Sequence, residues 1–146
     1  MDASAQLEQA LLMFRQTHPK RILQVGSSQW EFISGGKGER TIVIVAGAGS
    51  TAESMFSLNA ALESWCRVIF LGIPTTASTV DDVLRGIQAI LDSLGIGQAI
   101  LLGHSLGGMV VQCFAVQYPQ RVAGLVPSNT AFTWVRARYS CPLRRR

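Results

Sequence analysis

The sequence has 146 residues, 48% of them hydrophobic, and a net charge of +4 from 13 Lys and Arg against 9 Asp and Glu. Five of the arginines lie in residues 133–146, which contain no acidic residue, so residues 1–132 are close to neutral. This distribution excludes a basic surface for specific nucleic-acid binding. The length favours one domain with a single core.

The sequence also lacks the segments that direct proteins to or across membranes. Its apolar runs, such as 41–46 and 109–116, are far shorter than the roughly 18 to 20 residues of a membrane-spanning helix. The first residues include Asp2 and Glu8, where a secretory signal has basic side chains. We therefore expect a soluble protein without a membrane span, located in the cytoplasm.

The N-terminal third of the chain predicts one helix followed by three strands. Apolar residues recur at three- and four-residue spacing from Ala3 to about Thr17, which is the spacing of one helix face. Short strands are predicted at 22–25 and 29–33, and a turn-prone segment separates them from the β-branched strand at 41–45. This third strand is apolar on both faces, so we expect it to be buried.

The remainder of the chain predicts an alternation of helices and strands. We expect helices from 52 or 53 to 65, 80–94 and 106–118, and strands at 67–71, 98–102 and 122–126. The middle helix has the clearest ends, because Thr79 and Asp82 form a variant of the capping box and Gly95 suits the left-handed position after the last turn. This alternation predicts a mostly parallel sheet with helices on both faces.

Ser105 lies in a G-x-S-x-G motif between a predicted strand and a predicted helix. So sharp a turn brings together the residues two before and two after the serine, and Gly103 and Gly107 have no side chains to prevent it. The following helix directs its free N–H groups and the positive end of its dipole toward the hydroxyl, where an oxyanion would form. Strand, turn and helix in this order predict a nucleophile elbow.

From about Thr41 to Asn129 the chain resembles the α/β-hydrolase family of the hydrolase-1 type, whose elbow reads GHSLGG, as residues 103–108 do here. The loop 46–56 is similar to the family's oxyanion loop, particularly in the maspardin-like branch. The resemblance implies a three-layer α/β-hydrolase fold for residues 1–132, truncated after about the sixth strand. The implied activity is that of a serine hydrolase acting on an ester or related acyl substrate.

The resemblance also implies roles for individual residues. Ser105 would be the nucleophile, and the backbone N–H groups of Ala48 and Leu106 would form the oxyanion hole. The other residues of the implied elbow are Gly103, His104, Gly107 and Gly108. One departure is Ala46, which stands where many members have the histidine of an H-G pair, so the hydrogen bonds that usually anchor this loop are not assured.

The acid and the histidine of the triad follow the nucleophile in this fold, yet residues 106–146 contain no Asp, Glu or His. Both histidines of the sequence precede Ser105. We expect His104 to point away from the serine into the supporting structure, and His18 to be a solvated residue at a helix end. The chain by itself is therefore predicted to be catalytically inactive or impaired.

Residues 133–146 have no hydrophobic period and no resemblance to the family. We therefore separate them from the domain as a basic tail. One hypothesis is a truncated gene product, whose reading frame diverges near Ala131 or Phe132. The last strand would then be an unprotected sheet edge through which the protein could self-associate.

Two other functions fit parts of the sequence. Residues 47–52 match the G-x-G-x-x-A fingerprint of dinucleotide-binding proteins, but the strand that follows has no acidic residue at its end to hold a ribose. A noncatalytic interaction module is the other alternative, because a fold by itself does not establish activity. The three cysteines form no C-x-x-C pair. We expect neither a metal nor a cofactor, and the expected partner is a small acyl substrate.

Overall fold

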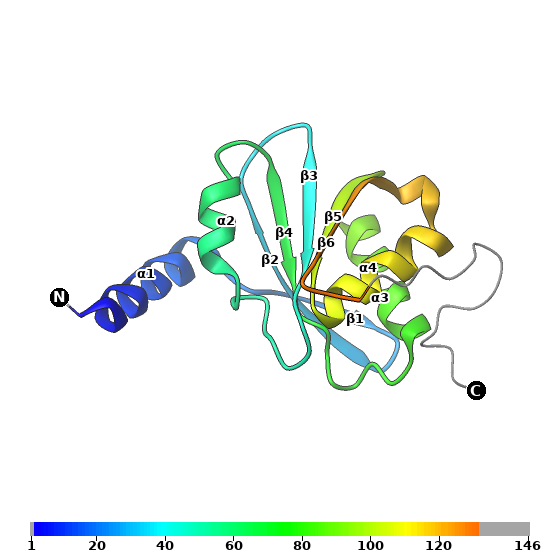
Figure 1. The fold of residues 1–146 in the computed structure, drawn as a ribbon, viewed down its shortest axis with the longest axis horizontal. Coiled ribbons are helices and arrows are strands. Elements are labelled where there is room, and N and C mark those ends of the chain that lie inside the picture. The colour runs from blue at the N-terminus through cyan, green and yellow to red at the C-terminus, as the bar shows by residue number, and fades with distance from the viewer. Residues whose placement is uncertain (1, 132–146) are drawn as a thin grey trace.

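The computed structural model describes residues 2–131 and places six strands in one sheet, in the order β1-β2-β4-β3-β5-β6 (Figure 1). The strands are β1 Arg21–Val25, β2 Ser28–Gly35, β3 Thr41–Val45, β4 Arg67–Leu71, β5 Ala99–His104 and β6 Val122–Ser128. β1 pairs with β2 and β2 with β4 in antiparallel fashion, whereas β4, β3, β5 and β6 run parallel. The mostly parallel sheet confirms the predicted fold class.

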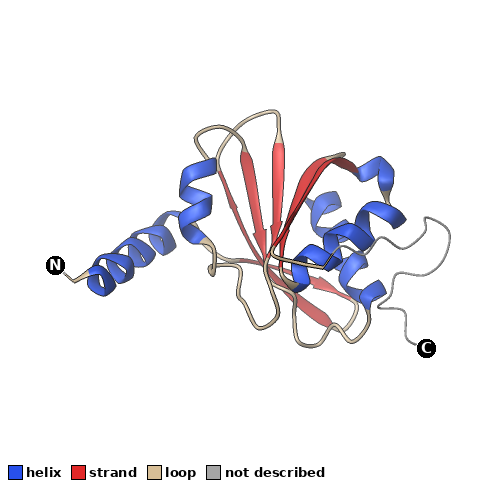
Figure 2. Cartoon of the chain, viewed as in Figure 1, coloured by secondary structure: helices blue, strands red, loops and turns tan. Residues whose placement is uncertain are grey.

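Helices cover both faces of the sheet, so the described chain has three layers (Figure 2). The helices are α1 Ala3–Thr17, α2 Phe56–Leu62, α3 Val80–Ser93, α4 Leu106–Gln117 and the short 3₁₀ helix η1 Pro119–Arg121. α3 and α4 pack on one face around the buried Trp30 and Phe114. α2 and the last turn of α1 pack on the other face, around Phe14 and Phe70. The sheet is therefore closed to solvent on both sides at its centre.

The central strand β3 is buried on both faces, as its apolar sequence predicts. Val43 and Val45 join the cluster beneath α3 and α4, whereas Ile44 joins the cluster beneath α2, and all three side chains are 0% exposed. β3 pairs in parallel with β4 on one side and with β5 on the other. Its position fixes where the loops after these three strands meet.

Helix α3 has the ends that its sequence predicts. The Thr79 hydroxyl accepts a hydrogen bond from the Asp82 N–H at 3.1 Å, and the Asp82 carboxylate accepts one from the Thr79 N–H at 3.0 Å. Beyond the last turn Gly95 has a φ of +65°, a left-handed conformation that glycine adopts without steric cost. In the middle of the helix, Gly86 lies directly against the indole ring of Trp30.

Helix α2 is shorter than predicted. It begins at Phe56 instead of residue 52 or 53, and it ends at Leu62 instead of residue 65. The reason is local: the Ser54 hydroxyl accepts a hydrogen bond from the Thr51 N–H at 2.9 Å, and the Ser54 N–H donates to the Thr51 carbonyl at 3.1 Å. These bonds form a turn that competes with helical pairing.

Strands β5 and β6 differ from prediction at their ends. β5 begins at Ala99 instead of residue 98 and continues through His104, so that Gly103 and His104 are still paired with β6. β6 continues to Ser128 instead of ending at residue 126. The sheet thus extends up to the residue before Ser105.

His18 is not the solvated residue that the sequence analysis expects. It follows the last residue of α1, but its side chain is only 13% exposed. Its ring stacks on Phe14 with 4.2 Å between ring centroids, and its Nε2 lies 2.7 Å from Oε2 of Glu63. Phe14 lies one turn earlier in the helix, and Glu63 follows α2, so the two together cover the imidazole.

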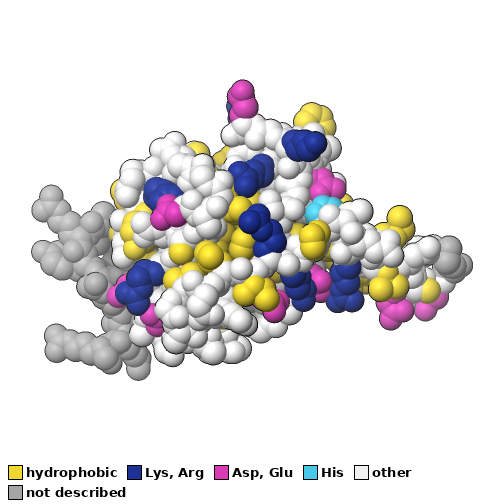
Figure 3. Space-filling view, turned by 180° about the vertical axis from the view of Figure 1, so that it is seen from behind, with side chains coloured by type: hydrophobic (Ala, Val, Ile, Leu, Met, Phe, Trp, Pro, Cys, Tyr) yellow, Lys and Arg dark blue, Asp and Glu magenta, His cyan; other side chains and the backbone are white. Residues whose placement is uncertain are grey.

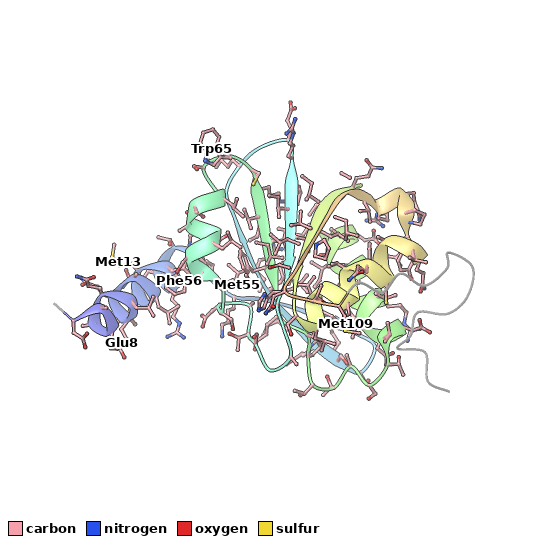
Figure 4. The ribbon with its side chains drawn as sticks, viewed as in Figure 1. Glu8, Met13, Met55, Phe56, Trp65 and Met109 are labelled. Carbon is pink, nitrogen blue, oxygen red and sulfur yellow. The ribbon has the colours of Figure 1, made fainter. Side chains whose placement is uncertain are left out.

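Most of α1 projects from the body of the molecule (Figure 3). Phe14 is its one buried residue, whereas Leu7 is 57% and Met13 is 62% exposed. Figure 4 shows Glu8 and Met13 away from the sheet, and Phe56 where α1 meets α2. The helix is therefore attached to the rest of the domain by its C-terminal end.

The predictions for the basic tail 133–146 and for Phe132 fall outside the described residues. No helix within residues 2–131 is long and apolar enough to cross a membrane.

Candidate active site

Ser105 occupies the turn that joins β5 to α4, and its side chain is exposed. Its backbone has φ 53° and ψ −120°, a conformation that L residues other than glycine rarely adopt and that occurs in tight turns at functional sites. The chain changes from strand to helix across this one residue, since His104 is still in β5 and Leu106 already begins α4.

Glycines permit this turn, as the sequence analysis expects for Gly103 and Gly107. A Cβ atom on Gly103 would overlap the carbonyl group of Gly107, and a Cβ on Gly107 would overlap the Val45 carbonyl oxygen at the end of β3. The turn at Ser105 and the end of the central strand therefore pack backbone against backbone. Gly108 meets a side chain instead, that of Thr130.

The last residue of β6, Ser128, and Thr130 just after it hold Ser105 by hydrogen bonds, and the sequence predicts neither. The Ser105 N–H donates to the carbonyl of Ser128 at 3.0 Å, and the Thr130 hydroxyl donates to the carbonyl of Ser105 at 2.7 Å. The Gly108 N–H donates to the same carbonyl at 3.0 Å. The strained backbone is thus fixed from both sides by hydrogen bonds.

The loop after β3 packs against the serine. A Cβ placed on Gly47 would lie 3.4 Å from the Ser105 Cβ and 3.9 Å from its Oγ, which is van der Waals contact, so the two residues are direct neighbours. Ala48, the next residue, is exposed. Within residues 2–131 neither the Ala48 N–H nor the Leu106 N–H donates a hydrogen bond. Two free backbone donors therefore lie on the two segments that meet at Ser105.

The position of Ser105 in the sheet also indicates a binding crevice. The connection after β3 passes over α2 to β4 on one face, whereas the connection after β5 passes over α4 to β6 on the other face. Adjacent parallel strands whose connections leave in opposite directions form a crevice at their carboxyl ends, where α/β proteins bind ligands. Here that switch point lies between β3 and β5, which are followed directly by the loop 46–55 and by Ser105.

Neither histidine is paired with the serine. No hydrogen bond joins His104 to Ser105 within the described residues, and His18 bonds to Glu63 instead. Within the same part of the chain, no three His, Cys, Asp or Glu side chains lie close enough together to hold a metal ion.

A cavity of about 700 Å³ lies beside the loop after β3. It opens between the β1–β2 hairpin, the loop after β3 and the loop after β4, and polar side chains predominate in its lining. The lining residues are Gln24, Ser27, Gln29, Glu31, Gly49, Ser50, Thr51, Ala52, Gly72, Ile73, Pro74, Thr75 and Thr76. Ser105 is not among them, so the cavity borders the loop after β3 at Gly49 and Ser50 and does not contain the serine.

The structure does not give residues 47–52 the context of a dinucleotide-binding turn. That fingerprint requires a helix that begins within the motif and presents its N–H groups to a pyrophosphate. Here residues 52–55 form turns, and α2 begins only at Phe56 and has 7 residues. Gly47 of this loop instead lies beside Ser105, and Gly49 has a φ of +72°.

Comparisons with known proteins agree with this geometry. The family model for the alpha/beta hydrolase fold matches residues 40–141. A 2-hydroxy-6-oxononadienedioate/2-hydroxy-6-oxononatrienedioate hydrolase from Burkholderia vietnamiensis is 33% identical over 104 residues, which are 62% of this chain and 36% of the relative. The dihydrolipoyllysine-residue acetyltransferase component of an acetoin cleaving system from Pseudomonas putida is 36% identical over 102 residues, 64% of this chain and 28% of the relative.

Among solved structures, naproxen esterase from Bacillus subtilis superposes with a TM-score of 0.73 at 20% identity, covering 92% of this chain and 52% of the esterase. At this identity the likeness concerns the fold. The chain thus spans about a third of the length of the curated relatives and about half of the solved structure.

Proposed function

Because the chain belongs to the α/β hydrolase fold family, we propose that Ser105 is the nucleophile of an acyl-transfer site that hydrolyses an ester or related acyl substrate. The backbone conformation of Ser105, φ 53° and ψ −120° at the switch point between β3 and β5, carries this proposal. A strained, exposed serine at the N-terminus of a helix has little value for packing, whereas it presents a hydroxyl to a ligand.

In the proposed reaction the Ser105 Oγ attacks the acyl carbon while a base accepts its proton. The negative charge that develops on the carbonyl oxygen is held by the N–H groups of Ala48 and Leu106, aided by the dipole of α4. The carbon–oxygen bond to the leaving alcohol then breaks, the alcohol takes the proton, and water releases the acyl group from Ser105 by the same steps.

We propose that the base and the acid come from residues outside this sequence. Residues 106–146 contain no Asp, Glu or His, and neither His18 nor His104 pairs with Ser105 within residues 2–131. This sequence would therefore contribute the nucleophile and the oxyanion hole, but no proton acceptor.

The names of the relatives support the proposed class of substrate. The relatives are a hydrolase, an acetyltransferase component and an esterase by name, and acyl transfer to or from a serine is chemistry that an elbow of this kind supports. The hydroxyl and amide groups of the neighbouring cavity favour polar groups on the part of the substrate remote from the reacting bond.

Intact-protein mass spectrometry after treatment with a fluorophosphonate probe tests the nucleophile. Because no base is paired with the serine, we expect little labelling in buffer and stoichiometric labelling when imidazole is added as an external base. The label disappears in Ser105→Ala and persists in Ser64→Ala, a matched change at an exposed serine in the turn after α2.

Equal labelling of the wild-type protein and Ser105→Ala, or no labelling of a folded sample with imidazole, would rule out the proposed nucleophile. The noncatalytic interaction module would then be the better account of the fold. Circular dichroism of each variant shows that the comparison is made between folded proteins.

A further inference from the structure

An ion pair links the N-terminal helix to the loop that packs against Ser105. Arg15, in the last turn of α1, donates from Nε to Oε1 of Glu53 at 3.1 Å and from Nη2 to Oε2 at 2.8 Å. Two parallel bonds between a guanidinium and a carboxylate fix orientation as well as distance. Glu53 lies five residues after Ala48 in the same loop, so the pair joins two segments 38 residues apart in sequence, one of which carries the proposed oxyanion-hole donor.

Because Glu53 is buried, its carboxylate needs the partners that this ion pair supplies. The residue is 8% exposed, and a carboxylate withdrawn from water to this extent has to be compensated by hydrogen bonds or opposite charge. Arg15 supplies both, and the Lys20 ammonium lies 3.7 Å from Oε1 of the same carboxylate. The Arg15 hydrogen bonds lower the pKa of Glu53 despite its burial.

Few hydrogen bonds join the residues around Ala48 to other segments, although Gly47 packs against Ser105 and the backbone of residues 50–52 packs against Gly72. Ala46 stands where the resemblance to the family places a histidine, and only its backbone is held, by the Leu71 carbonyl at 3.2 Å. The Ser50 N–H bonds within the loop, to the Gly47 carbonyl at 3.2 Å. Ala52 is buried in the same cluster as Phe14 of α1. The end of α1 is therefore joined to the loop by the charged contact of Arg15 and shares an apolar cluster with it through Phe14.

We propose that Arg15 and Glu53 are positioning residues that hold the loop 46–55 in place, so that the Ala48 N–H is aligned with Ser105. This inference rests on the proposed function, because alignment matters only if Ala48 forms the oxyanion hole. In this arrangement the C-terminal end of α1 supports the loop 46–55, which gives a role to a helix that otherwise projects into solvent.

The competing interpretation is that the pair only fastens α1 to the body. A second attachment of the same helix end separates the two interpretations, because His18 bonds to Glu63 after α2 and not to the loop. Removing the Glu63 carboxylate loosens the helix end but leaves the loop contact intact. Glu63→Gln is therefore a matched control for Glu53→Gln.

Hydrogen–deuterium exchange tests the inference without reference to activity. We expect Glu53→Gln, and to a smaller extent Arg15→Lys, to speed exchange of the loop amides at Ser50, Ser54 and Phe56. Arg15→Lys keeps the charge but loses the two parallel bonds, and its exposed position makes misfolding of this variant a minor concern. In Glu63→Gln the same amides should exchange as in the wild type.

The rate of fluorophosphonate labelling at Ser105, with imidazole present, gives the second readout. We expect it to fall about tenfold or more in Glu53→Gln, less in Arg15→Lys and not at all in Glu63→Gln, because small displacements of reacting groups cost rate steeply. The proposed positioning role is wrong if the loop amides exchange at the wild-type rate in both Glu53→Gln and Arg15→Lys. It is also wrong if Glu63→Gln changes their exchange as much as Glu53→Gln does. If loop exchange responds and no variant is labelled, the proposed nucleophile fails instead.

Discussion

At the scale of single residues, Ser105 is one of two residues other than glycine within residues 2–131 that have a positive φ, the other being Asn129. A residue other than glycine in such a conformation costs roughly 1–3 kcal/mol, and the bonds from Thr130 and to Ser128 hold it there. The fold thus retains a destabilising backbone conformation that places one hydroxyl. Such strain is expected at a reactive site, whereas a simple connection between a strand and a helix does not need it.

Ser105→Gly should therefore be more stable than Ser105→Ala by about 1 kcal/mol. Glycine adopts this backbone conformation freely, whereas alanine retains the steric cost of a Cβ atom without the hydroxyl. Urea denaturation of the two variants gives the difference in the free energy of unfolding. An alanine variant as stable as the glycine variant would show that the turn is not strained.

The sequence predicts the residues of the site that are neighbours of Ser105 in the chain. It does not predict the residues that reach Ser105 from a distant segment. Gly103 and Gly107 flank Ser105 in the motif, and the requirement for glycine there follows from the sharpness of the turn. Ser128 and Thr130 act through a backbone bond and a hydroxyl from a segment more than 20 residues away. No spacing rule links them to the serine, because their contact exists only once β6 has paired with β5.

At the scale of elements, the docking of α3 depends on a missing side chain. The indole of Trp30, which is 1% exposed, fills the space beside Gly86. Alanine is a better helix former than glycine by about 1 kcal/mol, but a Cβ here would overlap the ring, and overpacking costs roughly 1–3 kcal/mol.

We therefore expect Gly86→Ala to destabilise the protein although it favours the helix. Gly97→Ala is the matched control, because a Cβ at Gly97 meets nothing within 4 Å, and we expect it to be neutral or up to about 1 kcal/mol more stable. Thermal denaturation of both variants measures the difference. Stabilisation by Gly86→Ala would mean that Trp30 moves aside without cost.

Several element boundaries follow from local sequence, whereas β2 continues through Ser34 and Gly35, which the sequence predicts to lie in a turn. The bounds of α1, β3 and β4 agree with prediction, and the Thr79 cap of α3 is as expected. α2 differs because Thr51 and Ser54 bond to each other, a competition that hydrophobic spacing does not reveal. The strand order could not be predicted from the apolar pattern. A buried strand such as β3 would show the same pattern whichever two strands it paired with.

At the scale of the whole molecule, stability should depend on pH through Glu53. The Arg15 hydrogen bonds, and next the charge of Lys20, lower its pKa below the ordinary value of 4.5 in spite of burial. A carboxylate with a lowered pKa in the folded state contributes stability that is complete above the unfolded pKa. That contribution is lost as the pH falls through the folded value.

Glu53→Gln should therefore flatten the loss of stability between roughly pH 5 and pH 3. Denaturant titrations of the wild type and the variant at several pH values measure the two slopes. Glu8→Gln serves as the control, since Glu8 is exposed on α1 and forms no ion pair within residues 2–131. Equal slopes for the wild type and Glu53→Gln would show that Glu53 does not contribute to the pH dependence of stability. Asp82, whose pKa is lowered mainly by the Thr79 hydroxyl, contributes in the same direction in every variant.

The pairing of β3 also affects how the protein is made. β3 lies between β4 and β5, and both follow it in the chain. On the ribosome, one edge of this apolar strand stays open until Ala99–His104 has emerged, more than 50 residues after Val45. Unpaired apolar strands in growing chains are prone to aggregation. A chaperone that binds extended hydrophobic segments would therefore find its preferred target in the nascent chain at Thr41–Val45.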